Sequence, residues 1–118
     1  MPDTNFSLTT KEKNNINIIS LYGFLDAHTA PLLEDAISNL ADNEKFNILV
    51  NFNELNYISS AGLGVFMAFI EEIREKGGDI KLCAMNAKVF SVFDLLGFPL
   101  LFDIIETEEA GIKKFSSV

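Results

Sequence analysis

The sequence is poor in the side chains on which metal and disulfide chemistry depends. Its 118 residues include one cysteine, Cys83, and one histidine, His28. A single cysteine excludes an internal disulfide framework and a metal cage built from several thiolates. A single histidine removes most sites that need more than one imidazole ligand. We therefore predict no metal site and no cofactor.

Basic residues are also scarce. Nine Lys and Arg stand against 17 Asp and Glu, which gives a net charge of −8. A surface this acidic repels phosphate backbones and anionic lipid headgroups, so we expect no nucleic-acid binding and no attachment to membranes through a basic patch. The longest apolar stretch, residues 61–70, includes two glycines. It is far shorter than the ~20 residues that a membrane span needs, so we expect no membrane insertion.

A secretory signal is missing from the start of the sequence. Residues 1–13 are mostly polar and contain no apolar core of the kind that such signals need. The length fits one domain, since domains usually have roughly 100–200 residues. We expect a cytoplasmic protein with a single domain at residues 6–115, preceded by a flexible lead-in at residues 1–5.

Hydrophobic periodicity predicts alternating strands and helices. Strands are expected at residues 6–10, 16–22, 46–52 and 79–84, with a short extended segment at 100–102. Helices are expected at residues 26–40, 62–76, 86–96 and 107–114. The segment at residues 46–52 is nearly continuous in apolar character, which is typical of a central strand. This alternation indicates an α/β domain with parallel crossovers.

The helix at residues 62–76 carries apolar side chains on more than one side. Side chains at three- and four-residue spacing form a stripe that we expect to face the sheet: Leu63, Phe66, Met67, Ile70 and Ile73. Val65 and Phe69 fall outside this stripe. We expect them to form an exposed apolar patch, which is typical of a docking face.

Enzyme motifs are missing. Ser-His-Asp hydrolysis needs a base beside its nucleophile, and the glycine-flanked serine arrangement at residues 60–64 lacks the G-x-S-x-G of a nucleophile elbow. Gly62 and Gly64 match part of a phosphate-binding loop, but Met67 occupies the third glycine position. We therefore predict no catalytic residues. An enzyme or small-molecule binder using the neighbourhood of the serine pair and His28 stays as an alternative.

The serine pair Ser59 and Ser60 lies between an apolar strand-like stretch and the start of a helix. Serine is a favoured N-cap because its hydroxyl accepts a hydrogen bond from an unpaired amide. A phosphate at this position would also be compatible with the fold, because free N–H groups and the positive end of the helix dipole face it. It would add ~1.5–2 negative charges, enough to repel a docked partner. The residues alone leave both interpretations open.

These serines belong to a longer pattern. Residues 49–66, with Ser59-Ser60-Ala61-Gly62-Leu63-Gly64 near their end, resemble the signature of STAS domains, in particular the bacterial anti-sigma-factor antagonists. Residues 23–30 resemble the start of the family's first helix, and residues 78–82 and 95–98 fit a later strand and helix end. The resemblance covers about residues 6–114. It implies an α/β STAS fold, with a mixed sheet of four to five strands and about four helices.

The resemblance implies a partner switch. The unphosphorylated antagonist binds an anti-sigma factor that is also a serine kinase, and this frees a sigma factor. The kinase then phosphorylates the antagonist and the complex separates, until a PP2C-type phosphatase removes the phosphate. The family motif places the phosphorylated serine two positions before the first glycine, which is Ser60 here. Ser59 is the second choice.

The resemblance also implies a partner-binding surface around this loop. It includes the loop residues Ser59, Ala61, Gly62, Leu63 and Gly64, together with Asp26, Phe24 and Phe69. Asp26 matches a family aspartate near the phosphorylation loop, and a carboxylate favoured by the dipole of the following helix is an equally open interpretation.

Two residues depart from the family pattern. Ser59 stands where the motif usually has an aspartate, and Asn51 stands where an aspartate often lies on the preceding strand. The missing acidic residue favours an alternative function, as a STAS scaffold or transport-accessory subunit that is not phosphorylated.

Overall fold

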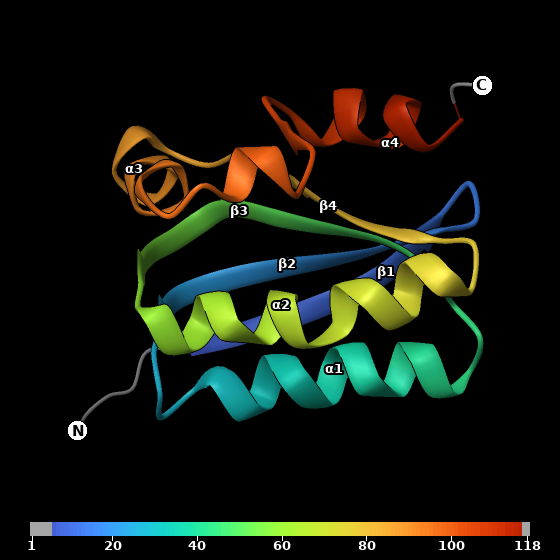
Figure 1. Cartoon of the computed structure of the whole chain (residues 1–118), viewed down its shortest axis with the longest axis horizontal. Coiled ribbons are helices and arrows are strands. Elements are labelled where there is room, and N and C mark those ends of the chain that lie inside the picture. The colour runs from blue at the N-terminus through green and yellow to red at the C-terminus, as the bar shows by residue number, and fades with distance from the viewer. Residues whose placement is uncertain (1–5, 117–118) are drawn as a thin grey trace.

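The computed structural model describes residues 6–116, apart from the side chain of Ser116, and the lead-in expected at residues 1–5 lies outside this range. Strands are β1 (Phe6–Lys13), β2 (Ile16–Leu25), β3 (Asn47–Ile58), β4 (Asp79–Cys83) and β5 (Ile104–Ile105). Helices are α1 (Ala30–Asp42), α2 (Ser60–Glu75), α3 (Ala87–Leu95) and α4 (Glu108–Ser116), with a 3-10 turn, η1 (Phe98–Leu100). Figure 1 shows α1 and α2 on one face of the sheet and α4 on the other.

The strands of the described sheet follow the order β1-β2-β3-β4-β5. β1 pairs with β2 in the antiparallel direction, and each later pair is parallel. Parallel neighbours need crossover connections, which the helices supply. The mixed five-stranded sheet, its four α-helices and the central place of β3 confirm the predicted fold class.

Two asparagines form the turn of the hairpin between β1 and β2. Asn14 and Asn15 have φ values of 55° and 65°. A two-residue hairpin turn of this kind requires positive φ at both positions, and asparagine adopts such angles more readily than most residues. β1 therefore continues to Lys13, beyond the strand predicted at residues 6–10.

Phenylalanine rings fill much of the core between the sheet and its helices. The ring of Phe93 on α3 lies 5.4 Å from that of Phe52 on β3 and 5.2 Å from that of Phe98. Phe98 and Phe102 stack at 5.3 Å with an interplanar angle of 9°. A smaller cluster lies on the other face, between the sheet and α4. Ile112 of α4 packs there with four residues of the strands: Ile16, Ile18, Leu49 and Cys83.

Several predicted boundaries are wrong. Helix α1 begins at Ala30 rather than at residue 26, because residues 26–29 form a hydrogen-bonded turn after β2. β3 continues to Ile58 because it pairs with β2 to the end of that strand. The extended segment predicted at residues 100–102 is instead a turn. Gly97, with φ 78°, and the stacked pair Phe98 and Phe102 define it.

None of the helices within residues 6–116 combines the length and the apolar character that crossing a membrane requires.

We predict that Cys83 is unreactive in the folded protein. It is fully buried on β4, and burial, with a smaller effect from nearby Glu108, raises the pKa of its thiol to about 12. Iodoacetamide at pH 8 should label the native protein at least about 100-fold more slowly than the urea-unfolded protein, because the thiolate is the nucleophile. Since the folded state holds this proton more tightly, the thiol's contribution to stability should fall as the pH rises above 9.0, the ordinary pKa of a cysteine thiol. Rapid labelling under native conditions would contradict this account of the β4 core.

Candidate functional site

The carboxyl ends of β2 and β3 bring two loops together. These strands are parallel, Leu25 lies opposite Ile58, and the backbone N–H of Ser59 donates to the carbonyl of Leu25 at 2.9 Å. The loop at residues 26–29 and the serine pair therefore lie at one edge of the sheet. In open α/β sheets this is the edge at which ligand sites form.

Asp26 organises the first of these loops. Its Oδ1 accepts hydrogen bonds from the backbone N–H groups of His28 at 2.9 Å and Thr29 at 3.1 Å. The Thr29 hydroxyl donates to the carbonyl of Phe24 and accepts from the N–H of Asp26, both at 2.9 Å. The carboxylate thus closes a turn just before α1, and Asp26 lies outside the first turn of that helix.

The two serines differ in accessibility. Ser60 is the first residue of α2 and is exposed. Ser59 is the N-cap residue, but its hydroxyl makes no capping bond. Its Oγ is buried and has no hydrogen-bond partner. Ser59 therefore does not form the side-chain cap that one of the two interpretations of the serine pair predicts, and the hydroxyl that a partner protein can reach is that of Ser60.

The glycines of the motif have different surroundings. A Cβ on Gly62 would lie 2.8 Å from Cγ of Leu25 and 3.1 Å from Cγ1 of Ile58, whereas a Cβ on Gly64 would meet open space. Leu63 is buried in the main core, and Ala61 is half-buried. Gly62 and Leu63 therefore seat α2 on the ends of β2 and β3, while Gly64 lies on the exposed side of the helix.

Two aromatic rings are exposed beside the serine pair. Phe24 is 45% exposed and Tyr57 is 44% exposed, and their ring centroids are 5.8 Å apart. Their strands pair at this point, so the rings are cross-strand neighbours. The sequence analysis missed Tyr57 because the strand predicted there ended at residue 52. Once β3 is extended to Ile58, its pairing with Phe24 follows from the register.

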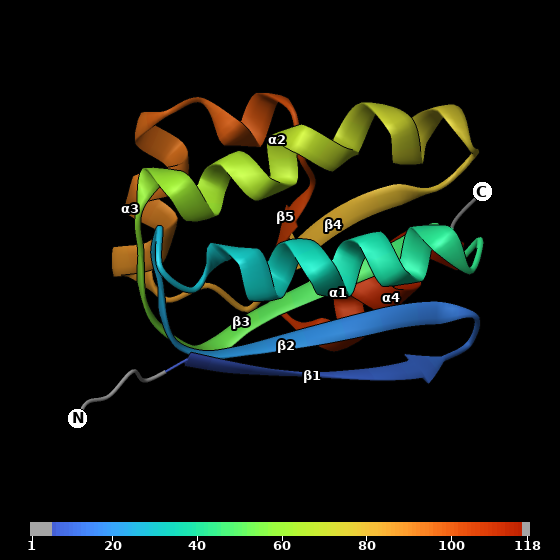
Figure 2. The same cartoon turned by 90° about the horizontal axis from the view of Figure 1, so that it is seen from below.

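The patch predicted from Val65 and Phe69 is wrong. Val65 is buried, and Phe69 is half-buried and packs against the main core. Met67, which was predicted to face inward, is instead 46% exposed. Helix α2 lies between α1 on one flank and the segment after α3 on the other (Figure 2). Residues two positions apart on a helix point to opposite flanks. Val65 therefore points to the flank that α1 covers, and Met67 points to the opposite flank, where it stays exposed.

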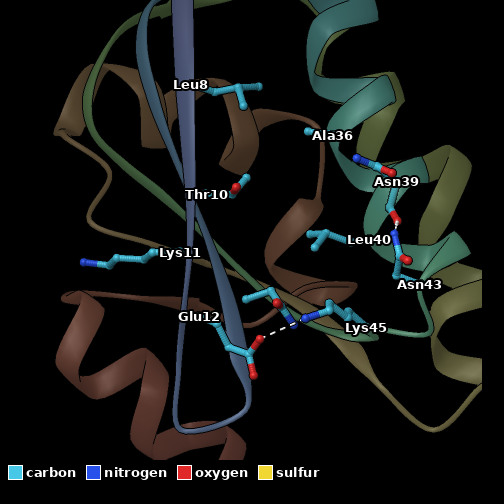
Figure 3. A pocket seen from close by; sticks show the side chains of 10 residues that line it. Leu8, Thr10, Lys11, Glu12, Ala36, Asn39, Leu40, Asn43 and Lys45 are labelled. Carbon is cyan, nitrogen blue, oxygen red and sulfur yellow. Dashed lines mark hydrogen bonds and ion pairs between the residues drawn. The ribbon is translucent and has the colours of Figure 1, made fainter.

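A separate cleft of about 420 Å³ lies between the β1–β2 hairpin and α1 (Figure 3). Its charged groups are already paired within the chain, since Lys45 Nζ lies 2.9 Å from Glu12 Oε1. Figure 3 shows Lys11 pointing away from the cleft, and its Nζ lies 3.4 Å from Glu108 Oε2. Within residues 6–116, no group of three or more His, Cys, Asp and Glu residues is placed to hold a metal ion. The edge that carries the serine pair is therefore the better candidate site.

Comparisons with known proteins identify the family and agree with this fold. A family model described as the STAS domain matches residues 7–111. The anti-sigma-B factor antagonist of Listeria monocytogenes is 31% identical over 103 residues, which cover 86% of this chain and 88% of that protein.

Three solved structures have the same fold. An anti-sigma factor antagonist from Mycobacterium paratuberculosis superposes with a TM-score of 0.88 at 19% identity, covering 95% of both chains. The anti-sigma factor antagonist SpoIIAA in its unphosphorylated form superposes with a TM-score of 0.74 at 23% identity, covering 96% of this chain and 99% of that one. The Bacillus cell fate determinant SpoIIAA has also been solved in the phosphorylated form, which superposes with a TM-score of 0.70 at 24% identity, covering 92% of this chain and 97% of that one.

We predict opposite effects from alanine at the two motif glycines. Gly62→Ala should lower the free energy of unfolding by about 1–3 kcal/mol, because the added methyl group overpacks the contact with Leu25. Gly64→Ala should raise it by about 0.5–1 kcal/mol, because alanine is the better helix former and nothing lies in its way. Urea unfolding of both variants tests the pair. Equal changes in the free energy of unfolding for the two variants would contradict the conclusion that Gly62 packs against the sheet while Gly64 is exposed.

We also predict that Ser59 contributes nothing as a cap. Ser59→Ala removes a buried hydroxyl without a partner, so stability should stay within about 0.5 kcal/mol of the original or rise. Asn86 is the matched control, because its Oδ1 accepts from the N–H of Val89 at 2.8 Å at the start of α3. Asn86→Ala should cost about 1 kcal/mol. A loss of that size at Ser59 would show that its hydroxyl does form a cap in solution.

Proposed function

The chain belongs to the STAS domain family, and from that premise we propose that it is an anti-sigma-factor antagonist whose binding is switched at Ser60. In the unphosphorylated state it binds an anti-sigma factor that is also a serine kinase, and a sigma factor is released. Phosphorylation of Ser60 by that kinase ends the interaction, and a PP2C-type phosphatase restores it. The protein acts in the cytoplasm by binding, and it has no catalytic role of its own.

The single observation that carries this proposal is the exposure of Ser60 at the first position of α2. The Ser60 side chain lies at the surface, whereas Oγ of Ser59 is buried. A kinase needs direct access to the hydroxyl that it modifies, so the geometry favours Ser60 as the acceptor. This choice agrees with the position that the family motif assigns.

The surroundings of Ser60 explain how a phosphate would end binding without unfolding the domain. The first N–H groups of α2 donate no hydrogen bond to the Ser59 side chain, so they can donate to an anion at the positive end of the helix. A partner docked over Ser60 and the exposed rings of Phe24 and Tyr57 would meet ~1.5–2 new negative charges. Desolvating these charges in an interface that holds two aromatic rings is costly, so affinity falls.

The predicted partner-binding residues then divide into two groups. Phe24 and Gly64 lie at the surface with Ser60, where a partner can touch them. The others support this surface: Asp26 closes the adjacent turn, the Ser59 hydroxyl is buried at the start of α2, and Gly62, Leu63, Ala61 and Phe69 seat α2 on the sheet or pack beside it. We propose that this second group acts on binding through the placement of α2.

One observation favours a second candidate function. Ser59 occupies the position that is usually acidic in the motif. Its hydroxyl is uncharged, buried and without a hydrogen-bond partner, so it does not take the place of the missing carboxylate. If the kinase requires that carboxylate, the chain acts as a STAS scaffold or transport-accessory subunit that is not phosphorylated.

We predict that the cognate anti-sigma factor kinase, with ATP, phosphorylates the protein at Ser60. Fragmentation mass spectrometry should locate the phosphate there, Ser60→Ala should abolish it, and the control Ser59→Ala should retain it. Ser60→Asp should weaken binding to the kinase at least ~10-fold in titration calorimetry, because a charge is buried in the interface.

Three outcomes distinguish the alternatives. A phosphate on Ser59 would mean that the family register misplaces the acceptor. Kinase binding that is unchanged by Ser60→Asp would favour the scaffold. A hydrolytic activity lost in Ser60→Ala would support an enzyme instead.

A further inference from the structure

A groove remains open on the flank of α2 that faces away from α1. It has a volume of about 690 Å³ and is lined by Met67, Ile70, Glu71, Arg74, Glu75 and Leu101, which we call the α2 groove. Figure 2 shows the orange segment after α3 running beside the middle of α2, and this segment supplies Leu101. The groove lies outside the loop that carries the serine pair.

Arg74 fixes the wall of the α2 groove. Its Nη2 donates to the carbonyl of Leu101 at 2.6 Å, and its Nε donates to Oδ1 of Asp79 at 2.9 Å. The guanidinium also lies 5.8 Å from the ring centroid of Phe102. These contacts join α2 to the segment after α3, so the two sides of the groove are held at a set separation before any partner arrives.

Three of the residues that line the groove are apolar. Ile70 is buried at its floor, whereas Met67 and Leu101 are each 46% exposed. Beyond the groove lining, the end of α3 and the segment after it expose three more leucines, since Leu95 is 84%, Leu96 is 55% and Leu100 is 91% exposed. Burying one such side chain is worth about 1.5–3 kcal/mol, and neighbouring exposed apolar side chains mark an interaction surface.

The charge at the groove is negative and uncompensated. Glu71 and Glu75 are exposed, and within residues 6–116 neither makes an ion pair. The positive charge of Arg74 is already paired with Asp79. A complementary partner therefore carries basic residues beside its apolar ones. A second copy of this chain is disfavoured, because its net charge is −8 and a symmetric contact would place the same glutamates face to face.

We propose that the α2 groove binds a basic amphipathic helix of a partner protein. Apolar side chains spaced three or four residues apart would lie on Met67, Ile70 and Leu101, with Lys or Arg beside Glu71 and Glu75. Ile70 is ten residues from Ser60, or about 15 Å along α2 at 1.5 Å per residue. Binding here is therefore a second contact, which goes beyond the proposed switch and does not depend on the state of Ser60.

The test uses two synthetic helical peptides of about 18 residues, long enough for some five turns. One has a Leu stripe with Lys on its flanks, and the other has the same stripe with Glu. Titration into the ¹⁵N-labelled protein should shift the amides of residues 67–75 and 101 with the Lys peptide only. Glu71→Lys with Glu75→Lys should weaken binding at least ~10-fold, because complementary charge is replaced by like charge.

Matched variants separate the groove from general charge attraction. Glu34→Lys with Asp35→Lys makes the same change in net charge on exposed positions of α1 and should alter affinity by less than ~3-fold. Leu101→Ser should weaken binding, and Ser60→Asp should leave it unchanged. Ser60→Asp is also the variant that should weaken binding to the kinase. The switch is therefore tested by kinase binding and the groove by peptide binding, so either proposal can fail while the other holds.

Several results would overturn the inference. Amide shifts that map away from the groove would mean that the peptide binds elsewhere. An equal loss of affinity in the α1 control would mean that net charge alone attracts the peptide. Lack of binding by the Lys peptide would exclude the groove as its site. A concentration-dependent dimer in sedimentation, dispersed by Met67→Glu, would show that the occupant is a second copy of the chain.

Discussion

The parallel pairing of β2 with β3 is the interaction on which the rest of the structure depends. It extends to Leu25 and Ile58 and ends with the hydrogen bond from Ser59 to Leu25. Because both strands finish together, the turn made by Asp26 and the start of α2 meet at one edge of the sheet. The same pairing brings Phe24 beside Tyr57. A shorter β3 would leave the loops apart and the two rings separated.

The periodicity of the sequence was sufficient to predict the order of the elements and the central strand, because these follow from local apolar patterns. The accessibility of individual side chains was harder to predict. Val65 and Met67 are both apolar and lie two residues apart, and only the neighbours of α2 decide which is covered. The difference between Ser59 and Ser60 is of the same kind, since it depends on how the helix is seated.

The motif around Ser60 combines residues that pack α2 against the sheet with residues that stay exposed. Gly62 and Leu63 are required where α2 approaches the sheet, so they would be retained even in a protein without any switch. Ser60 is exposed at the start of α2, and in the proposed function it is the residue at which partner binding is controlled. For this reason a match to the whole motif shows the fold more directly than it shows phosphorylation.

The strand order also bears on how the chain reaches this structure. Each strand of the described sheet lies next to the strand that precedes it in the sequence, so no strand must enter between two that have already paired. Contacts between elements close in sequence cost less loop-closure entropy and favour rapid folding. As the chain leaves the ribosome, the β1–β2 hairpin can form first and later strands can add at one growing edge. The domain can therefore assemble in the direction of its synthesis, with the loop that carries Ser59 and Ser60 completed before the C-terminal helix covers the opposite face.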